Sequence, residues 1–444
     1  MAGEWKELPL PDELPAIPDG WIYKSLGDLV DERGVSYGIV QPGSETTDGV
    51  PIVRVNNIRN GRIDTTDMLK VGADIEAKFQ RSRLRGGEVL LTLVGTLGEV
   101  AIVPDNLRGW NVARAVGVIP VRNDPGNLWV SICLRSAFIQ HCIRTWATTT
   151  VQATFNLRDL AKLPIPIPPT ETRNAIAAVL GALDDKIELN RRMNATLEAM
   201  ARALFQSWFV DFDPVRAKLD GRKPTGIDPD IAALFPESLE DSPLGLIPKG
   251  WEVKPLSELC QLGRGASPRP INDYMNGEVP WVKIADATSA GGPFLFETKE
   301  KVTKAGAERS VAVIPGDLIL SNSATCGVPM FVELHGCIHD GWLYFKNLRS
   351  ISKLYLFHVL IELAEHLVRI ADGSVQKNLN TLLVGQQNVL IPPKAVVDAF
   401  DAQATVWFGK IRQSGLESRT LAALRDTLLP KLLSGELSVA GGSF

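Results

Sequence analysis

Two segments of the chain carry apolar residues at spacings that alternate between four and three. The first runs from Ile176 to Leu204 and the second from Phe400 to Leu428, an offset of 400 − 176 = 224 residues. An average spacing of about 3.5 is the period of a coiled-coil seam, so each segment is predicted to form one long helix. The predicted seam positions are Ile176, Leu180, Leu183, Ile187, Asn190, Asn194, Leu197, Ala201 and Leu204 in the first helix, and Phe400, Ala404, Trp407, Ile411, Ser414, Ser418, Leu421, Arg425 and Leu428 in the second, with Leu424 as an alternative to Arg425.

Polar residues interrupt both stripes near their centres. Asn190 and Asn194 stand in the first stripe, and Ser414 and Ser418 stand in the second. A buried asparagine opposite leucine would leave its amide unpaired at a cost of about 1–3 kcal/mol, so the polar positions favour a register in which they face each other. Two like units associate most readily about a two-fold axis, which makes the helices antiparallel. In the alternative, each helix packs only on its own domain.

Outside the two long segments, the apolar pattern is shorter and mixed. Runs such as 89–91 and 318–320 are separated by Gly, Asn and Pro, which is typical of short strands and turns. Leu354 to Arg369 is an exception with helical spacing. The predicted fold class is therefore α+β, with two similar mixed α/β domains joined by two long helices that form an antiparallel coiled coil.

The two halves repeat the same landmarks in the same order. Residues 17–21, Ile-Pro-Asp-Gly-Trp, return at 247–251 as Ile-Pro-Lys-Gly-Trp, and Gly-Glu-Val-Leu-Leu at 87–91 is matched by Gly-Asp-Leu-Ile-Leu at 316–320. An order of landmarks kept over a whole half-chain indicates two copies of one unit. Two copies of a binding unit suit a target with two parts.

The repeat sets the predicted domain boundaries, and a stretch with many prolines separates the halves. The predicted parts are a first domain at 1–165, a long helix at 166–212, a Pro-rich spacer at 213–246 with a short helix near 228–235, a second domain at 247–390, a second long helix at 391–436 and a tail at 437–444.

Composition narrows the class of protein. The chain has 444 residues, of which 45% are hydrophobic and 22% charged, which is ordinary for a soluble globular protein. No apolar run approaches the roughly 20 residues that span a bilayer, and no signal peptide is expected. The five cysteines include no CxxC pair and are predicted to be reduced thiols in a cytoplasmic protein. The net charge of −4 disfavours phosphate as a partner, but basic residues gather locally near 54–62, 78–85 and 299–309.

Catalytic motifs are missing from the sequence. It has no Walker loop, no HExxH, no glycine-rich cofactor fingerprint and no Asn-Pro-Pro-aromatic motif for amino-methyl transfer. The segment 297–299 with Asp286 has the residue types of a nuclease site, but the first half lacks a counterpart, so a solvated loop is favoured. His335 and His339 have the spacing of metal ligands on a helix, but flanking glycines favour a turn with ordinary surface histidines. We therefore expect a non-catalytic chain with no cofactor or metal of its own.

The remaining signals are those of binding. Arg54, Asn56, Asn57 and Arg59 are predicted to lie on a strand and the turn after it. Arginine and asparagine read the edges of guanine and adenine well; a purely structural polar hairpin is the alternative.

Repeated turns give further candidates. Thr96 and Thr325 lie in turns where glycine supplies a positive φ, and a phosphate contact is the second interpretation. Gln152 and Gln376 each precede an asparagine by four residues and either face DNA or belong to a helix cap, with the cap favoured. The candidate DNA-binding residues are Arg54, Asn56, Asn57, Arg59, Thr96, Gln152, Lys283, Ser321, Asn322, Thr325 and Gln376.

Together these motifs resemble those of the specificity (S) subunits of type I restriction–modification systems. The resemblance covers nearly the whole chain. It is carried by the Gly-Trp start of each half, by Leu-Gly-Asp at 26–28 and Leu-Ser-Glu at 256–258, by the repeated segments 87–91 and 316–320, by the two helices that follow Pro-Pro, and by residues 207–218.

The resemblance implies a function for each part. The two domains would be target-recognition domains, each reading one half of a bipartite double-stranded DNA sequence. The helices would set the spacing and dock two copies of a methylation subunit, which carries S-adenosylmethionine, and a motor–nuclease restriction subunit can join that core. Two other classes stay open: a non-catalytic two-domain adaptor that binds only protein, and a stand-alone DNA-modifying enzyme, against which the missing motifs argue.

Overall fold

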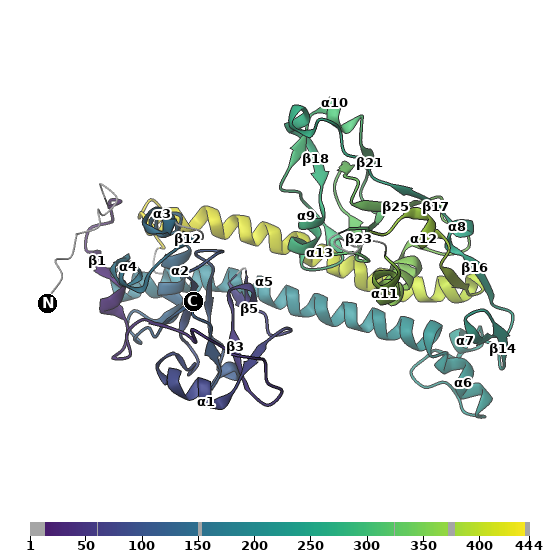
Figure 1. The fold of residues 1–444 in the computed structure, drawn as a ribbon, viewed down its shortest axis with the longest axis horizontal. Helices are drawn as coiled ribbons and strands as arrows, with labels where there is room; N and C mark the ends of the chain where they lie inside the picture. Colours follow the sequence, from purple (N-terminus) through teal and green to yellow (C-terminus); the bar gives the residue numbers. More distant parts are fainter. Residues whose placement is uncertain (1–13, 60, 150–152, 324, 372–377, 440–444) are drawn as a thin grey trace. The chain divides into compact units, whose positions relative to one another are not determined.

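The computed structural model describes residues 14–59, 61–149, 153–323, 325–371 and 378–439. The chain divides into two compact units, which are described separately: unit 1 comprises Met1–Lys186 and Thr420–Phe444, and unit 2 comprises Ile187–Arg419. The division falls within the two long helices, α5 (Thr170–Phe205) and α13 (Lys394–Leu433). Each unit therefore contains one mixed α/β domain and a segment of each long helix (Figure 1).

The domain of unit 1 is built on a four-stranded antiparallel sheet in the order β2-β10-β7-β8. The two inner strands bury all of their residues, which explains their continuous apolar sequences. A second sheet, β6-β3-β9, contains one antiparallel and one parallel pair. The strands are β1 (Ile22–Ser25), β2 (Ser36–Tyr37), β3 (Val50–Val53), β4 (Ile58–Arg59), β5 (Arg62–Ile63), β6 (Leu69–Val71), β7 (Val89–Thr92), β8 (Val100–Ile102), β9 (Asn111–Val112), β10 (Val116–Ile119), β11 (Thr148–Thr149), β12 (Ala153–Thr154) and β13 (Pro164–Ile167).

The domain of unit 2 repeats this topology. Its sheet β17-β25-β22-β23 corresponds to β2-β10-β7-β8 and is extended by β19, and β20-β18-β24 corresponds to β6-β3-β9 and is extended by β21. The predicted internal repeat is therefore a repeat of fold. The strands are β14 (Leu239–Ser242), β15 (Gly245–Pro248), β16 (Glu252–Pro255), β17 (Gln261–Arg264), β18 (Met275–Val282), β19 (Phe294–Leu295), β20 (Lys301–Val302), β21 (Val311–Val313), β22 (Leu318–Ser321), β23 (Pro329–Val332), β24 (Gly336–Ile338), β25 (Trp342–Lys346) and β26 (Asn388–Ile391).

One helix in each domain is tied to the last strand by an aromatic side chain. In unit 1, the indole nitrogen of Trp129 in α2 donates to the carbonyl of Pro166, at 2.9 Å. In unit 2, the hydroxyl of Tyr355 in α11 donates to the carbonyl of Leu390, at 3.0 Å. The helix predicted at 354–369 is confirmed as α11. The shorter helices are α1 (Ala73–Glu76), α2 (Asn127–Arg135), α3 (Ala137–Trp146), α4 (Leu157–Lys162), α6 (Asp213–Leu219), α7 (Pro229–Ala232), α8 (Leu256–Leu259), α9 (Ile284–Ala290), α10 (Lys304–Ala307), α11 (Lys353–Ile370) and α12 (Thr381–Gly385).

In unit 1 the two long helices contribute to the core of the domain. Ile176 and Leu180 of α5 are each 1% exposed and belong to the same buried cluster as Leu429 and Leu432 of α13. The seam also contains an ion pair, because Arg425 contacts Asp184 at 2.8 Å. The alternative seam residue, Leu424, is 45% exposed, so that prediction is wrong and the arginine keeps the seam position.

In unit 2 the polar positions of the two helices face each other. The Nδ2 atom of Asn190 donates to Glu417 Oε2 at 2.8 Å and to Ser418 Oγ at 3.3 Å. Four residues further along α5, Nδ2 of Asn194 reaches back to the carbonyl of Ile411, at 3.5 Å. From Asn190 to Asn194 the residue numbers rise along α5, while those of the partners on α13 fall from Ser418 to Ile411. The helices are therefore antiparallel and their polar layers face each other, as predicted. The alternative of helices that pack only on their own domains is wrong.

The long helices are shorter than predicted at their starts. They begin at Thr170 and Lys394 rather than at 166 and 391, because β13 and β26 occupy the preceding residues and pair with β1 and β16. The first ends at Phe205 and is followed by one π turn, Gln206–Val210, before Phe212 adopts a left-handed φ of 55°.

The predicted Pro-rich spacer is an ordered part of unit 2. It contains α6, α7 and the hairpin β14–β15. Phe212 and Phe235 are buried against Trp251, with ring centroids 6.0 and 6.1 Å from it. Pro214 and Pro229 lie in the first turns of α6 and α7, where proline is tolerated, so they start helices instead of marking a linker.

Leu180 tests the seam, because its side chain is 1% exposed. The variant Leu180→Asp is expected to lose several kcal/mol of unfolding free energy, since a buried carboxylate would lack a partner. The matched control Leu189→Asp changes a residue of the same helix that is 56% exposed and should stay within about 0.5 kcal/mol of wild type. Denaturant unfolding measures the unfolding free energy of both variants. A loss for Leu180→Asp as small as that for Leu189→Asp would show that the stripe is not a packed seam.

His358 of α11 lies among aromatic rings in the core of unit 2. The centroids of Phe205, Phe400 and Phe408 are 5.3, 5.5 and 5.6 Å from that of its imidazole. Neither ring nitrogen has a hydrogen-bond partner within the described residues. Burial, with a smaller effect of the charge on Arg202, lowers the pKa of His358 from 6.5 to about 4.

This histidine predicts acid sensitivity. The unfolded chain takes up the proton near pH 6.5 and the folded chain only near pH 4, so stability that is complete above pH 6.5 falls as the pH is lowered between these values. The variant His358→Phe should flatten the fall of the Tm over this interval. His366→Phe, which changes an exposed histidine of the same helix, should keep the wild-type slope. Parallel Tm curves for wild type and His358→Phe would contradict the assignment.

Candidate nucleic-acid interface

Arg54 and Asn57 hold a turn together at the end of β3. The amide of Arg54 donates to Asn57 Oδ1 at 3.0 Å, and Nη2 of Arg54 contacts both the carbonyl and the carboxylate of Asp67, at 2.9 and 3.1 Å. Asn57 is 3% exposed, and its Nδ2 donates to the carbonyls of Asp64 and Asp67. Both side chains therefore brace the hairpin β4–β5, which was the structural alternative for this segment.

Asn56 and Arg59 are the exposed members of the same segment. Asn56 lies in a single 3-10 turn, Val55–Asn57, and Arg59 ends β4. The predicted strand and turn are thus a 3-10 turn followed by a strand. These two side chains face solvent and keep their hydrogen-bonding groups available to a ligand.

The second domain has the same cap at the equivalent place. The amide of Lys283 donates to Asp286 Oδ2 at 2.8 Å, and its ammonium contacts Glu300 at 2.6 Å and lies 4.9 Å from the Trp281 ring centroid. The second carboxylate oxygen of Asp286 accepts the amide of Lys299, at 3.0 Å. Asp286 is therefore a buried structural carboxylate, not part of the solvated loop expected from the sequence.

The repeated turns between β7 and β8 and between β22 and β23 carry the glycines that they need. Gly98 and Gly327 have φ of 87° and 84°, which favours glycine. Thr96 and Thr325 are exposed in these turns. Ser321, in contrast, is 1% exposed and its Oγ accepts the amide of Val328, at 2.8 Å.

Two of the candidate residues, Gln152 and Gln376, lie outside the described residues. The asparagines that follow them are helix caps, since Asn156 Oδ1 accepts the amide of Asp159 at 2.9 Å and Asn380 Oδ1 accepts that of Leu383 at 2.8 Å. They cap the short helices α4 and α12 and not the entries of the long helices.

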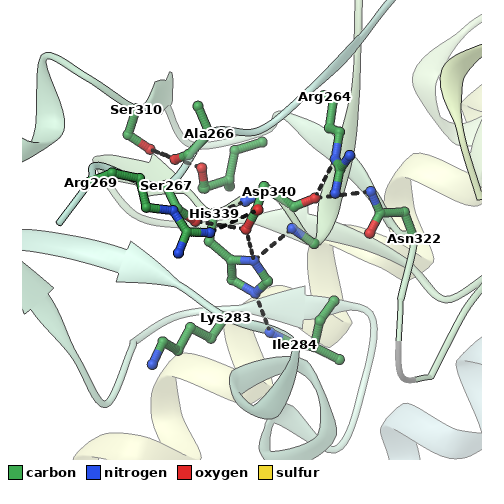
Figure 2. Close-up of polar contacts among 12 residues, drawn as sticks. Arg264, Ala266, Ser267, Arg269, Lys283, Ile284, Ser310, Asn322, His339 and Asp340 are labelled. Atoms are coloured by element: carbon green, nitrogen blue, oxygen red, sulfur yellow. Dashed lines mark hydrogen bonds and ion pairs between the residues drawn. The ribbon is translucent and has the colours of Figure 1, made fainter. Parts of the chain in front are cut away.

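A polar corner of the second domain brings the candidate residue Asn322 together with residues for which the sequence predicted no binding role (Figure 2). It is formed by the turn between β24 and β25 and the segment after β17. The carbonyl of Asp340 accepts Nε of Arg264 at 2.7 Å and Nδ2 of Asn322 at 3.0 Å. The carboxylate of Asp340 accepts Ser267 Oγ at 2.7 Å and lies 3.6 Å from Nη2 of Arg269.

His339 belongs to this corner and is not the surface histidine expected. Its side chain is 16% exposed. The ring nitrogens face two main-chain amides, with Nδ1 2.6 Å from the nitrogen of Gly341 and Nε2 3.2 Å from that of Ile284. Burial lowers the pKa of His339 despite the neighbouring Asp340 carboxylate. The residue is a structural element of the turn.

The described part of the chain contains neither a candidate metal site nor a candidate membrane-spanning helix. There, no group of three or more His, Cys, Asp or Glu side chains could hold a metal ion. No helix among the described residues is long and apolar enough to cross a membrane. All five cysteines are buried as free thiols.

Comparison with known proteins identifies relatives of both halves. The model for the type I restriction modification DNA specificity domain matches residues 18–199 and again 248–402. The chain is 30% identical over 336 residues to the type I restriction enzyme HindI specificity subunit of Haemophilus influenzae, covering 64% of this chain and 71% of that protein. It is also 30% identical to the EcoBI specificity subunit of Escherichia coli, over 45% of this chain and 44% of that protein.

A solved structure has the same fold. The crystal structure of a type I restriction–modification S subunit from M. genitalium matches with a TM-score of 0.51 and 15% sequence identity, over 93% of this chain and 96% of that one. At this identity, the match bears on the fold alone.

Asn57 is buried and supports the hairpin, whereas its neighbour Asn56 is exposed. Substitution of the two residues should therefore have different effects. Asn57→Ala should lower the free energy of unfolding by about 1–3 kcal/mol, because it leaves buried main-chain groups unpaired. Asn56→Ala is the matched control and should leave stability unchanged, since its side chain is exposed. Denaturant unfolding of both variants checks this, and a larger loss for Asn56→Ala would reverse the two roles.

Proposed function

The chain belongs to the family of type I restriction–modification DNA specificity domains, which it contains twice, and from this premise we propose that each domain reads one half of a bipartite double-stranded DNA target. The observation that carries the proposal is the repeat of one domain topology on a shared pair of helices. Two like domains joined by a helix pair can each contact one segment of a duplex. The chain itself is a non-catalytic specificity subunit.

The candidate DNA-binding residues predicted from the sequence narrow to those that the fold leaves exposed. In unit 1 they are Asn56, Arg59 and Thr96, and in unit 2 Thr325. Arginine and asparagine suit bidentate contacts to guanine and adenine, and threonine suits a phosphate oxygen. Asn57, Ser321 and Asn322 are buried and support these surfaces from within the domains. The side chains of Arg54 and Lys283 are partly exposed but are held by Asp67 and Glu300.

Methyl transfer requires a partner in this proposal. We assign S-adenosylmethionine to a methylation subunit, two copies of which would dock on the two repeats, and a motor–nuclease restriction subunit would join the same cytoplasmic complex. In unit 2 the long helices expose apolar side chains away from their seam. Leu189 and Met200 of α5 are 56% and 44% exposed, and Val406 of α13 is 68% exposed. Apolar side chains on the outer faces of a helix pair suit a protein partner.

The function is tested by exchanging one domain. Replacing residues 17–165 with the matching segment of another family member, in a host that carries the methylation subunit, should change one half of the methylated sequence and keep the other. Methylome sequencing reads this directly. A change in both halves would show that the domains are not independent readers. If the wild-type complex shows no salt-dependent retention on DNA, the chain is a protein-binding adaptor instead.

Docking is tested by Val406→Asp. This change should leave the Tm of the isolated chain unchanged, because the side chain is exposed, and should reduce the mass of the complex formed with the methylation subunit. The matched control Leu246→Asp alters a residue of the spacer hairpin that is 56% exposed and should leave the complex intact. Light scattering of the purified mixtures measures the mass, and an undiminished mass for Val406→Asp would remove this face from the interface.

A further inference from the structure

The main-chain pairing around the polar corner of the second domain has an equivalent in the first domain. In unit 1, Tyr37 of β2 pairs with Gly117 of β10, and in unit 2, Arg264 of β17 pairs with Leu343 of β25. Since β2 and β10 correspond to β17 and β25, Tyr37 and Arg264 occupy the same position. The side chains differ in role, because the Tyr37 hydroxyl accepts the amide of Leu157, at 3.2 Å, inside its domain.

A second pair of equivalent positions lies beside the first. The amide of Leu93 donates to the carbonyl of Ala115 at 2.8 Å, and the amide of Asn322 donates to that of Gly341 at 2.9 Å. Leu93 and Asn322 are therefore equivalent. The residues just before Ala115 and Gly341 are Arg114 and Asp340. The same frame thus carries different chemistry in the two domains, and the differing pairs are Tyr37 and Arg264, Leu93 and Asn322, and Arg114 and Asp340.

Asn322 is costly for folding. It is 1% exposed where the first domain has a fully buried leucine. Its Nδ2 donates to the carbonyl of Asp340, but its Oδ1 is buried and has no hydrogen-bond partner within the described residues. A leucine would avoid the unpaired oxygen, which costs about 1–3 kcal/mol. Fold stability alone therefore does not explain this asparagine, whereas fixing the carbonyl of Asp340 does.

That carbonyl anchors Arg264 by one nitrogen only. Nε of Arg264 donates to it at 2.7 Å, and the residue is exposed. Within the described residues, Nη1 and Nη2 form no hydrogen bond or ion pair. The guanidinium is thus held through Nε (Figure 2), and its Nη1 and Nη2 atoms form a fork of donors. Such a fork matches the O6 and N7 acceptors of guanine in the major groove.

A second arginine at this corner suits a phosphate of the same duplex. Arg269, on the other side of the Asp340 carboxylate, has a side chain that is 73% exposed. Its contact of 3.6 Å with that carboxylate is long for an ion pair, so it can turn toward a phosphate. Ser267 Oγ donates a hydrogen bond to this carboxylate.

We propose that Arg264 is a base-reading residue of the second domain, which recognises a guanine in the half of the target that this domain contacts, and that Asn322 is its positioning residue. The inference rests on the proposed function. A side chain that is already held in place loses little conformational entropy on binding, so its contact discriminates more strongly between bases.

The experiment uses the full chain in complex with its methylation subunit and duplexes that contain the wild-type methylated target. Single guanines of the second half-site are replaced by 7-deazaguanine, which lacks the N7 acceptor. Arg264→Gln is expected to weaken binding of the unmodified target by about 5- to 150-fold. Wild type should be sensitive to 7-deazaguanine at one position, and Arg264→Gln should be insensitive there. Arg222→Gln, an exposed arginine of the same unit paired only with Asp220 among the described residues, is the matched control and should behave as wild type.

Further variants separate base reading from charge and from folding. Arg264→Lys keeps the charge but loses the planar fork, so the salt dependence should stay while the sensitivity to 7-deazaguanine falls. Asn322→Leu restores the residue of the first domain. It should keep or raise the Tm and still weaken guanine discrimination, which a purely structural role would not do.

The outcomes are distinct. A uniform loss of affinity in Arg264→Gln, with the salt slope reduced by about one and sensitivity to 7-deazaguanine unchanged, would mean a phosphate contact and would overturn base reading. Binding by Arg264→Gln equal to that of Arg222→Gln would also overturn it. If wild type itself binds no specific bipartite target, the proposed function fails and not only this inference.

Discussion

The apolar seam between the two long helices is the interaction on which the rest of the structure depends. In unit 1 the core of the domain is completed by Ile176 and Leu180 of α5 and by Leu429 and Leu432 of α13. In unit 2, Phe205 and Phe400 belong to the main buried cluster of the domain. A fully buried Leu, Ile or Phe contributes about 1.5–3 kcal/mol. Since the same helices complete both cores, neither domain can be regarded as folding apart from them.

The polar layer of the seam lowers the stability of the helix pair but favours one register. Nδ2 of Asn190 finds partners on α13, but the Oδ1 atoms of Asn190 and Asn194 and the Oγ of Ser414 are buried without partners in the described part of the chain. Apolar residues would pack there at lower cost. A shifted register, however, would place the amides against apolar side chains and lose the bonds that remain. The layer therefore penalises misaligned pairings more than it weakens the native one.

The sequence predicted those features that depend on periodicity, and it missed those that depend on side-chain direction. The long helices and α11 follow from apolar spacing, and the repeat follows from landmarks kept in order. Asn56 and Asn57 are adjacent and chemically identical, yet one is exposed and the other is 3% exposed, because a 3-10 turn directs them differently. The glycines that flank His339 predicted an open turn with a surface histidine, and only tertiary packing buries its side chain. The prolines of the spacer predicted a linker, but proline marks helix starts as well as breaks, and here it begins α6 and α7.

Specificity can differ between two copies of one fold because the frame is built from main-chain bonds. The equivalent pairings of β2 with β10 and of β17 with β25 make no demand on the side chains that they carry. A tyrosine can therefore serve the interior of one domain while an arginine at the same position faces outward from the other. The choice of side chain is less free where an exposed residue needs a buried residue to hold it in place. Asn322 is such a buried residue, since it places an amide in a position that leucine fills in the other domain and leaves one oxygen unpaired. A buried residue that the fold alone would disfavour thus points to the surface that it supports.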